Sequence, residues 1–164
     1  MACEEIALCP MTRALCHALF RDFQYDPDTF EDLERFARFI YDAEWVDRYF
    51  DRQQKEDRVS LAILRGGEIV GELLFKGIDR QKRECALSIH LQSDAVKNLG
   101  IGTRAEELAL GYAFGELGME AVNADALLKN ARSRHVLEKA GFCQTGEDGR
   151  FAFYRCARRG GAQR

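Results

Sequence analysis

The stretch Lys97-Asn98-Leu99-Gly100-Ile101-Gly102-Thr103 decides the interpretation of this chain. It lies between an alternating, strand-like run at 85–91 and a strongly helical run at 104–117. Two glycines at a strand-to-helix junction allow the backbone to approach a ligand without a side-chain clash. The first turn of the helix adds unpaired N–H groups and the positive end of the helix dipole. Together these features predict a phosphate-binding loop whose ligand is a phosphorylated cofactor.

The length and composition predict one folded domain. The chain has 164 residues, of which 46% are hydrophobic, so it has enough apolar material for a core of its own. We expect a single domain over 1–157 and a basic, flexible tail over 158–164. No apolar run approaches the roughly 20 residues that a membrane span needs. The acidic start Met1-Ala2-Cys3-Glu4-Glu5 does not resemble a signal peptide, so we expect a cytoplasmic protein without membrane contact.

Charge and cysteine content argue against several other classes of function. A net charge of −3 does not indicate a nucleic-acid partner. The six cysteines include no C-x-x-C pair and no histidine cluster accompanies them, so we expect no metal. Residues 22–57 hold twelve acidic and five basic residues. This imbalance indicates either solvated helix faces or an acidic rim that attracts a cationic substrate.

The hydrophobic periodicity predicts a mixed α+β domain. Alternation indicates strands, and apolar residues three or four apart indicate helices. The expected elements are a strand at 5–9, helices at 13–23 and about 29–52, a three-stranded meander within 59–91, a helix at 101–117, a strand near 122–126, a helix at 130–141, and an antiparallel pair at 142–143 and 151–156. The order is therefore β-α-α-β-β-β-α-β-α-β-β, and the glycine loop joins a central strand to its following helix.

Two motifs resemble those of the GNAT superfamily of N-acetyltransferases. The family's cofactor motif Q/R-x-x-G-x-G/A here runs from Lys97 to Gly102, with Lys in the Q/R position. The motif N-x-x-S…V-L-E-K-x-G-F runs from Asn130 to Phe142 and is similar to that of the ribosomal-protein alanine N-acetyltransferase branch. A lone G-x-G is weak evidence, but here two motifs occur at the family's separation. The resemblance implies the acyl-CoA N-acyltransferase fold, a mixed and mostly antiparallel central sheet flanked by helices.

The resemblance also implies acetyl-CoA as the cosubstrate. Its pyrophosphate would lie on the loop amides, with Lys97 adding a charge nearby. Its pantetheine arm would pair with an exposed strand edge, and Asn130 would bond the same arm unless it is only a helix cap. The residues expected to hold the cofactor are Ile89, His90, Leu91, Lys97, Asn98, Leu99, Gly100, Ile101, Gly102, Thr103, Asn130 and Ser133.

Candidate catalytic residues follow from the needs of acetyl transfer. The attacking amine must be neutral, and the departing thiolate benefits from a proton donor. Many family members have a tyrosine donor seven residues after the asparagine, where this chain has Leu137; Ser133 is the candidate in its place. His90 and Glu72 are the candidate bases, because an imidazole titrates near neutrality and a glutamate can act through a water. Asp125 is a third option.

The family fold places the acceptor pocket between the first two helices and the C-terminal hairpin. The acidic 22–57 region would then attract an ammonium group, with Tyr25, Trp45 and Tyr154 available to contact it. The expected function is direct transfer of acetyl from acetyl-CoA to a primary amine, either a small molecule such as a polyamine or a protein N-terminus. The alternative is a catalytically silent acyl-CoA-binding or regulatory module, which Leu137 keeps open. Edge strands and the hairpin also leave a homodimer open.

Overall fold

Seven strands form one sheet in the computed structural model, which describes residues 4–29 and 38–160. The sheet order is β1-β2-β3-β4-β5-β7-β6. The strands are β1 (Ile6–Pro10), β2 (Val59–Arg65), β3 (Glu68–Asp79), β4 (Glu84–Leu91), β5 (Ala121–Leu127), β6 (Cys143–Glu147) and β7 (Phe151–Ala157). The helices of the described residues are α1 (Arg13–Arg21), α2 (Ala43–Arg52), α3 (Ile101–Gly115) and α4 (Ala131–Ala140), with short 3-10 turns η1 (Pro27–Thr29) and η3 (Asp94–Val96).

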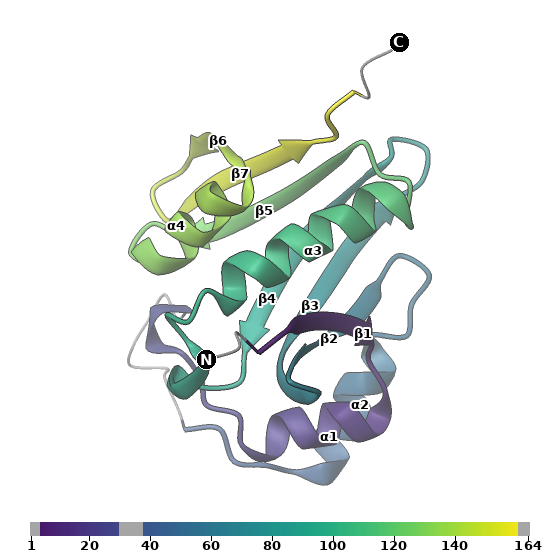
Figure 1. Ribbon diagram of the computed structural model, residues 1–164, viewed down its shortest axis with the longest axis vertical. Helices are drawn as coiled ribbons and strands as arrows, with labels where there is room; N and C mark the ends of the chain where they lie inside the picture. The colour runs from purple at the N-terminus through teal and green to yellow at the C-terminus, as the bar shows by residue number, and fades with distance from the viewer. Residues whose placement is uncertain (1–3, 30–37, 161–164) are drawn as a thin grey trace.

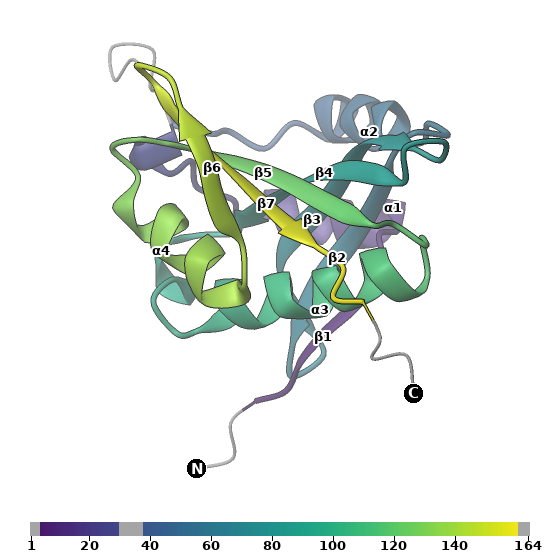
Figure 2. The ribbon, with the colours of Figure 1, turned by 90° about the horizontal axis from the view of Figure 1, so that it is seen from above.

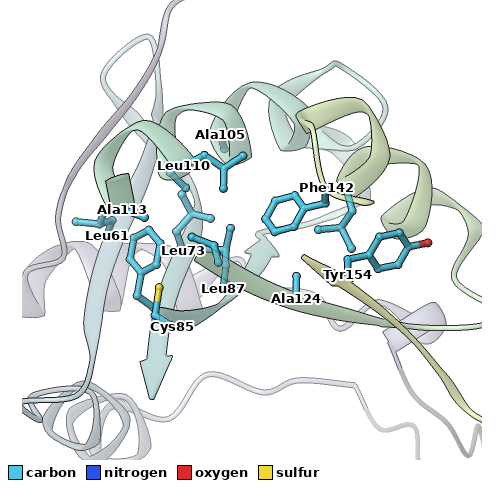
Figure 3. Packing of buried hydrophobic residues seen from close by; sticks show 14 of the residues in the cluster. Leu61, Leu73, Cys85, Leu87, Ala105, Leu110, Ala113, Ala124, Phe142 and Tyr154 are labelled. Carbon is cyan, nitrogen blue, oxygen red and sulfur yellow. The ribbon is translucent and has the colours of Figure 1, made fainter. Parts of the chain in front are cut away.

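Helices cover both faces of the sheet (Figure 2). The α1–α2 face holds a buried cluster of Met11, Cys16, Leu19, Phe20, Val46 and Ala62. The α3–α4 face holds a larger core, part of which is drawn in Figure 3. Because successive strand residues point to opposite faces, Leu73 of β3 lies in the larger core while Glu72 faces α1 and α2. The predicted mixed, mostly antiparallel sheet flanked by helices is confirmed.

The central strands β4 and β5 are paired over only part of their length. They form the parallel pair of the sheet, and their register covers three residue pairs, ending at Ala86 and Asn123. The two strands then diverge (Figure 1), so residues 87–91 of β4 pair with β3 alone among the described strands. The sheet therefore opens at the carboxyl end of β4, next to the glycine loop.

Some element bounds differ from the predicted ones. The first part of the expected 29–52 helix falls on residues 30–37, outside the described residues. After it, residues 38–42 are irregular and Ile40 is 80% exposed, so this residue does not belong to an apolar helix face. Asp42 begins α2, because its carboxylate accepts a hydrogen bond from Trp45 N at 3.0 Å. Helices α1 and α3 each end two residues before the predicted position.

Strand β3 contains a bulge next to Gly71, and the glycine itself has a separate role. The register shift lies one residue earlier: Gly71 pairs with Ile63 and Ile69 pairs with Leu64, which leaves Val70 as the extra residue. At Gly71 itself, a Cβ atom would lie 2.7 Å from the carbonyl oxygen of His90. Glycine is therefore needed where β3 and β4 approach each other beside the opening in the sheet.

Candidate active site

A cavity of about 350 Å³ opens where β4 and β5 diverge. Phe20, Trp45 and Tyr49 line it from the α1–α2 face, and Glu106 and Ser133 line it from the α3–α4 face. Because one cavity is lined from both faces, it passes through the gap between the two strands. The ends of several elements that are distant in sequence meet at this point.

The glycine loop presents backbone amides to an anion. Asn98 (φ +58°) and Gly100 (φ +75°) are left-handed, and Gly100 is the N-cap of α3. No side chain caps this helix, so its first N–H groups keep their hydrogen-bonding capacity. Left-handed turns followed by free amides form anion-binding concavities. Of the loop side chains, Leu99 is exposed and Ile101 enters the core, so neither adds a polar group beside these amides.

Lys97, predicted to add a charge near the phosphates, forms ion pairs within the protein. It lines the cavity but is only 8% exposed, and its Nζ lies 2.9 Å from Asp26 Oδ2 and 2.6 Å from Asp94 Oδ1. Asp26 also accepts a hydrogen bond from Arg132 at 2.7 Å. Burial opposes ionisation of Asp26, but the bonds from Lys97 and the Asp28 amide hold its pKa below the ordinary value. The Lys97 charge is therefore already paired within the protein.

Glu72 is held by two hydroxyl groups on the α1–α2 face. Its Oε2 accepts from the Tyr49 hydroxyl at 2.6 Å, and its Oε1 accepts from Ser60 Oγ at 2.8 Å. The residue is 1% exposed, and this burial raises the pKa of its carboxyl although both hydrogen bonds favour the charged form. Burial and the neighbouring carboxylate likewise raise the pKa of Tyr49, which keeps its proton.

His90 lies opposite Glu72 in the β3–β4 register, on the same face of the sheet. Its ring lines the cavity, is accessible from it, and has no hydrogen bond to a described residue. The surrounding protein, and secondarily the charge of Lys76, lower the pKa of the imidazole below its ordinary value of 6.5. The ring is therefore neutral at pH 7 and able to accept a proton.

The N-terminus of α4 brings Asn130 and Ser133 to the cavity. Asn130 Oδ1 accepts from Ser133 N at 3.0 Å and so caps the helix. The amide nitrogen of Asn130 and the hydroxyl of Ser133 have no partner among the described residues, although both residues line the cavity. Leu137, in the position of the family's tyrosine, is 3% exposed and packs in the core instead.

The chain resembles known acetyltransferases in sequence and in fold. The profile of the acetyltransferase (GNAT) domain family matches residues 6–143. The chain belongs to the GNAT family of acyltransferase enzymes. The predicted family is thus confirmed.

Individual relatives of this GNAT chain share less than a third of its sequence. It is 29% identical over 103 residues to the probable N-acetyltransferase YjcK of Bacillus subtilis. The aligned stretch covers 62% of this chain and 57% of the length of that relative. The ribosomal-protein-S5-alanine acetyltransferase of Vibrio fischeri has a TM-score of 0.77 at 14% identity, covering 96% of this chain and 95% of that one. The spermidine N-acetyltransferase of Vibrio cholerae, solved in complex with CoA and spermine, has a TM-score of 0.69 at 12% identity, covering 93% and 95%. At these identities the structural likeness shows the fold alone.

Some residues predicted for the GNAT site lie elsewhere. Tyr154, expected to contact the acceptor, is 1% exposed, and its hydroxyl lies 3.2 Å from Arg134 Nε and 3.3 Å from Glu138. Asp125, the third candidate base, is exposed on β5 and does not line the cavity. Tyr154 does not line the cavity, because its position on β7 points its side chain toward α4 and the core rather than toward the gap.

The acidic rim is not formed by the described residues of 22–57. Asp47 and Asp51 bind Arg13 at 2.8 and 2.6 Å on the outer surface of α1 and α2. Asp26 is the described acid of this region that lines the cavity, and it is paired with Lys97 and Arg132. The interpretation as solvated and ion-paired helix faces is therefore the better one for the described part of the region.

Sequence analysis missed several cavity residues of this GNAT chain. Phe20 and Tyr49 line the cavity, but both lie in helical stretches where an aromatic residue gives no local signal of a site. Glu106 also went unnoticed, although it lies four residues after Gly102 and so on the same helix face. Among the described residues, no cluster of three or more metal-ligating side chains is present, and no helix is long and apolar enough to cross a membrane.

Proposed function

We propose that this GNAT protein transfers the acetyl group of acetyl-CoA directly to a primary amine. The observation that carries the proposal is a single cavity, which connects the α3 N-terminal region at Gly102 with the His90–Glu72 pair through the gap in the sheet. Family membership and a neighbour solved with CoA and spermine support it. A cosubstrate bound at the loop would reach the proton-accepting side chains through this gap.

The residues present fit the proposed cosubstrate. The uncapped amides at the start of α3 suit its pyrophosphate, and residues 87–91 of β4 offer a strand edge without a β5 partner to its pantetheine arm. Asn130 lines the same cavity, and its amide nitrogen has no partner among the described residues. When bound, acetyl-CoA supplies the acyl group as an activated thioester.

His90 is the proposed base. A neutral imidazole accepts one proton from the arriving ammonium, and the freed amine then forms its bond to the acyl carbon as the bond from carbon to sulfur breaks. The amine loses its second proton as the amide forms. The Ser133 hydroxyl is the proposed relay: it gives its proton to the leaving sulfur and takes the second amine proton in return. Glu72 and Tyr49, hydrogen-bonded to each other, hold the ammonium beside His90.

The cavity walls favour an amine on an apolar body. Aromatic rings of Phe20, Phe23, Tyr25, Trp45 and Tyr49 line the acceptor side. Such rings contact both apolar groups and cations. Among the described lining residues, Glu72 and Asp26 already have partners, which leaves few anionic contacts for the further charges of a polyamine. An amine screen therefore includes apolar monoamines beside spermidine and basic N-terminal peptides.

Calorimetric titration with acetyl-CoA tests the proposal. Gly102→Glu places a bulky acid in the cavity and should abolish binding, whereas Gly111→Glu on the exposed side of α3 is the matched control. Turnover is followed by mass spectrometry of the acetylated amine, because six cysteines would interfere with a thiol dye. No binding by the wild type overturns the proposal. Binding without turnover of any amine supports the silent acyl-CoA module, the second candidate, which the buried Leu137 favours.

A further inference from the structure

Glu106 is a cavity residue that the proposed reaction does not use. It lies in α3 one turn after Gly102, is 2% exposed, and lines the cavity. It forms no hydrogen bond or ion pair with a described residue, and its Oε2 is enclosed without any partner. Its neighbours on the buried side of the helix, Ala105 and Ala109, are fully buried apolar residues.

An enclosed carboxyl without a partner lowers the stability of the fold. Burial raises the pKa of Glu106 to about 8, so the group carries its proton at neutral pH. A protonated carboxyl has one O–H donor and a carbonyl acceptor, and leaving them unpaired in the interior is unfavourable. An apolar side chain of similar size would avoid this penalty, so the fold itself gains nothing from a glutamate at this position.

The position of Glu106 matches the path of an extended ligand through the gap. Gly102 of the same helix face packs near Val136 of α4, where an added Cβ would lie 3.5 Å from Val136 Cγ1. Ile89 of β4 lines the cavity from the strand that faces the gap. A pantetheine arm that runs from the loop to the acyl site carries two amide groups through this space. The β4 edge can bond one side of the arm, and Glu106 is the enclosed polar group on the α3 side.

We propose that the protonated carboxyl of Glu106 donates a hydrogen bond to an amide carbonyl of the pantetheine arm. The inference rests on the proposed use of acetyl-CoA and adds a cofactor-binding residue to it. Bonds to the β4 edge and to Glu106 would hold the arm from two sides and direct the thioester toward His90. The unsatisfied donor of the free protein is then paired in the complex.

Three variants test this assignment by calorimetry and thermal melting. Glu106→Leu removes the donor, Glu106→Gln keeps a neutral hydrogen-bonding group, and Glu107→Leu is the matched control because Glu107 is exposed on the same helix. We expect Glu106→Leu to weaken acetyl-CoA binding roughly tenfold or more, the size of one hydrogen bond, while Glu106→Gln and Glu107→Leu stay within about threefold of the wild type. Affinity for 3′-phospho-ADP, which lacks the arm, should be unchanged in all of them.

The melting temperature separates a binding role from a structural one. Glu106→Leu should melt higher than the wild type, because an unpaired buried carboxyl is replaced by an apolar group. Equal acetyl-CoA affinity in the wild type and Glu106→Leu overturns the assignment, and so does equal loss of acetyl-CoA and 3′-phospho-ADP binding. If Glu106→Leu does not fold, Glu106→Met replaces it under the same criteria. Failure of the wild type to bind acetyl-CoA would instead overturn the proposed function.

Discussion

At the scale of single residues, Glu72 and His90 face each other but differ in their hydrogen bonding. Glu72 and His90 are cross-strand neighbours, yet Glu72 accepts two hydroxyl hydrogen bonds while His90 has no partner among the described residues. The glutamate is thus fixed in place, and the imidazole is free to exchange a proton with a ligand. Gly71, which pairs with Leu91 on the same two strands, sets how closely their backbones approach.

Replacing His90 should separate catalysis from cofactor binding. We expect His90→Gln to lower kcat about 100-fold, the usual contribution of a general base, and to leave acetyl-CoA affinity unchanged. Because the pKa of His90 is lowered, the neutral and active form persists at pH 6.5, and the wild-type rate should fall only at more acidic pH. A pH profile of kcat/KM for both proteins checks this. If kcat/KM of His90→Gln still falls at acidic pH as in the wild type, another group is the base, and Glu72 is the first candidate.

A methyl group at Gly71 should destabilise the sheet. The Cβ of Gly71→Ala would lie 2.7 Å from a backbone oxygen that cannot rotate away. We expect a loss of roughly 1–3 kcal/mol in the free energy of unfolding, as for other overpacked sites. Gly111→Ala in α3, where nothing lies within 4 Å, should instead add about 0.5–1 kcal/mol. Urea denaturation of both variants measures this difference, and equal effects would contradict it.

At the scale of elements, two helix N-termini meet at one cavity with different caps. Helix α3 begins at a glycine and leaves its amides free, whereas α4 begins at Asn130, which uses its side-chain oxygen on Ser133 N. One helix end is therefore suited to an external anion, and the other has one of its first N–H groups bonded within the protein. Asn130 retains its amide nitrogen for a ligand.

Two substitutions at Asn130 should distinguish the cap from the ligand contact. Asn130→Asp keeps a capping oxygen and loses the N–H donors, so stability should change little while acetyl-CoA affinity falls several-fold. Asn130→Ala loses both and should also cost about 1 kcal/mol of unfolding free energy. Chemical denaturation and calorimetry of the pair measure the two effects. Unchanged affinity in Asn130→Asp would reduce Asn130 to a helix cap.

At the scale of the whole molecule, Asp26 connects three distant segments. Its carboxylate binds Lys97 after β4 and Arg132 in α4, and the latter contact spans 106 residues of sequence. The segment after α1 is thereby tied to the glycine loop and to the α4 N-terminus, which surround the cavity. The shape of the cavity consequently depends on a charge network as well as on apolar packing.

Breaking this network should lower stability in a pH-dependent way. Asp26→Asn should reduce the unfolding free energy by about 1–3 kcal/mol at pH 7, because Lys97 and Arg132 lose a common anionic partner. The folded-state pKa of Asp26 is below 3.8, so its contribution is present above that pH and is lost as the pH falls through the folded value. Urea denaturation at pH 7 and pH 3 tests this. Asp28→Asn is the control, because Asp28 is more exposed. An equal loss of unfolding free energy in this control would argue against a special role for the Asp26 ion pairs.

Local sequence features determined the element order, the glycine loop before α3 and the Asn130 cap of α4. Alternation, helical spacing and capping act between residues a few positions apart, so they can be identified without the fold. The tertiary structure alone decided that Tyr154 is buried, that the Lys97 charge is paired with Asp26, and that Glu106 faces the opening between β4 and β5. Those outcomes depend on contacts between residues far apart in sequence, and on where two strands stop pairing, which no local pattern encodes.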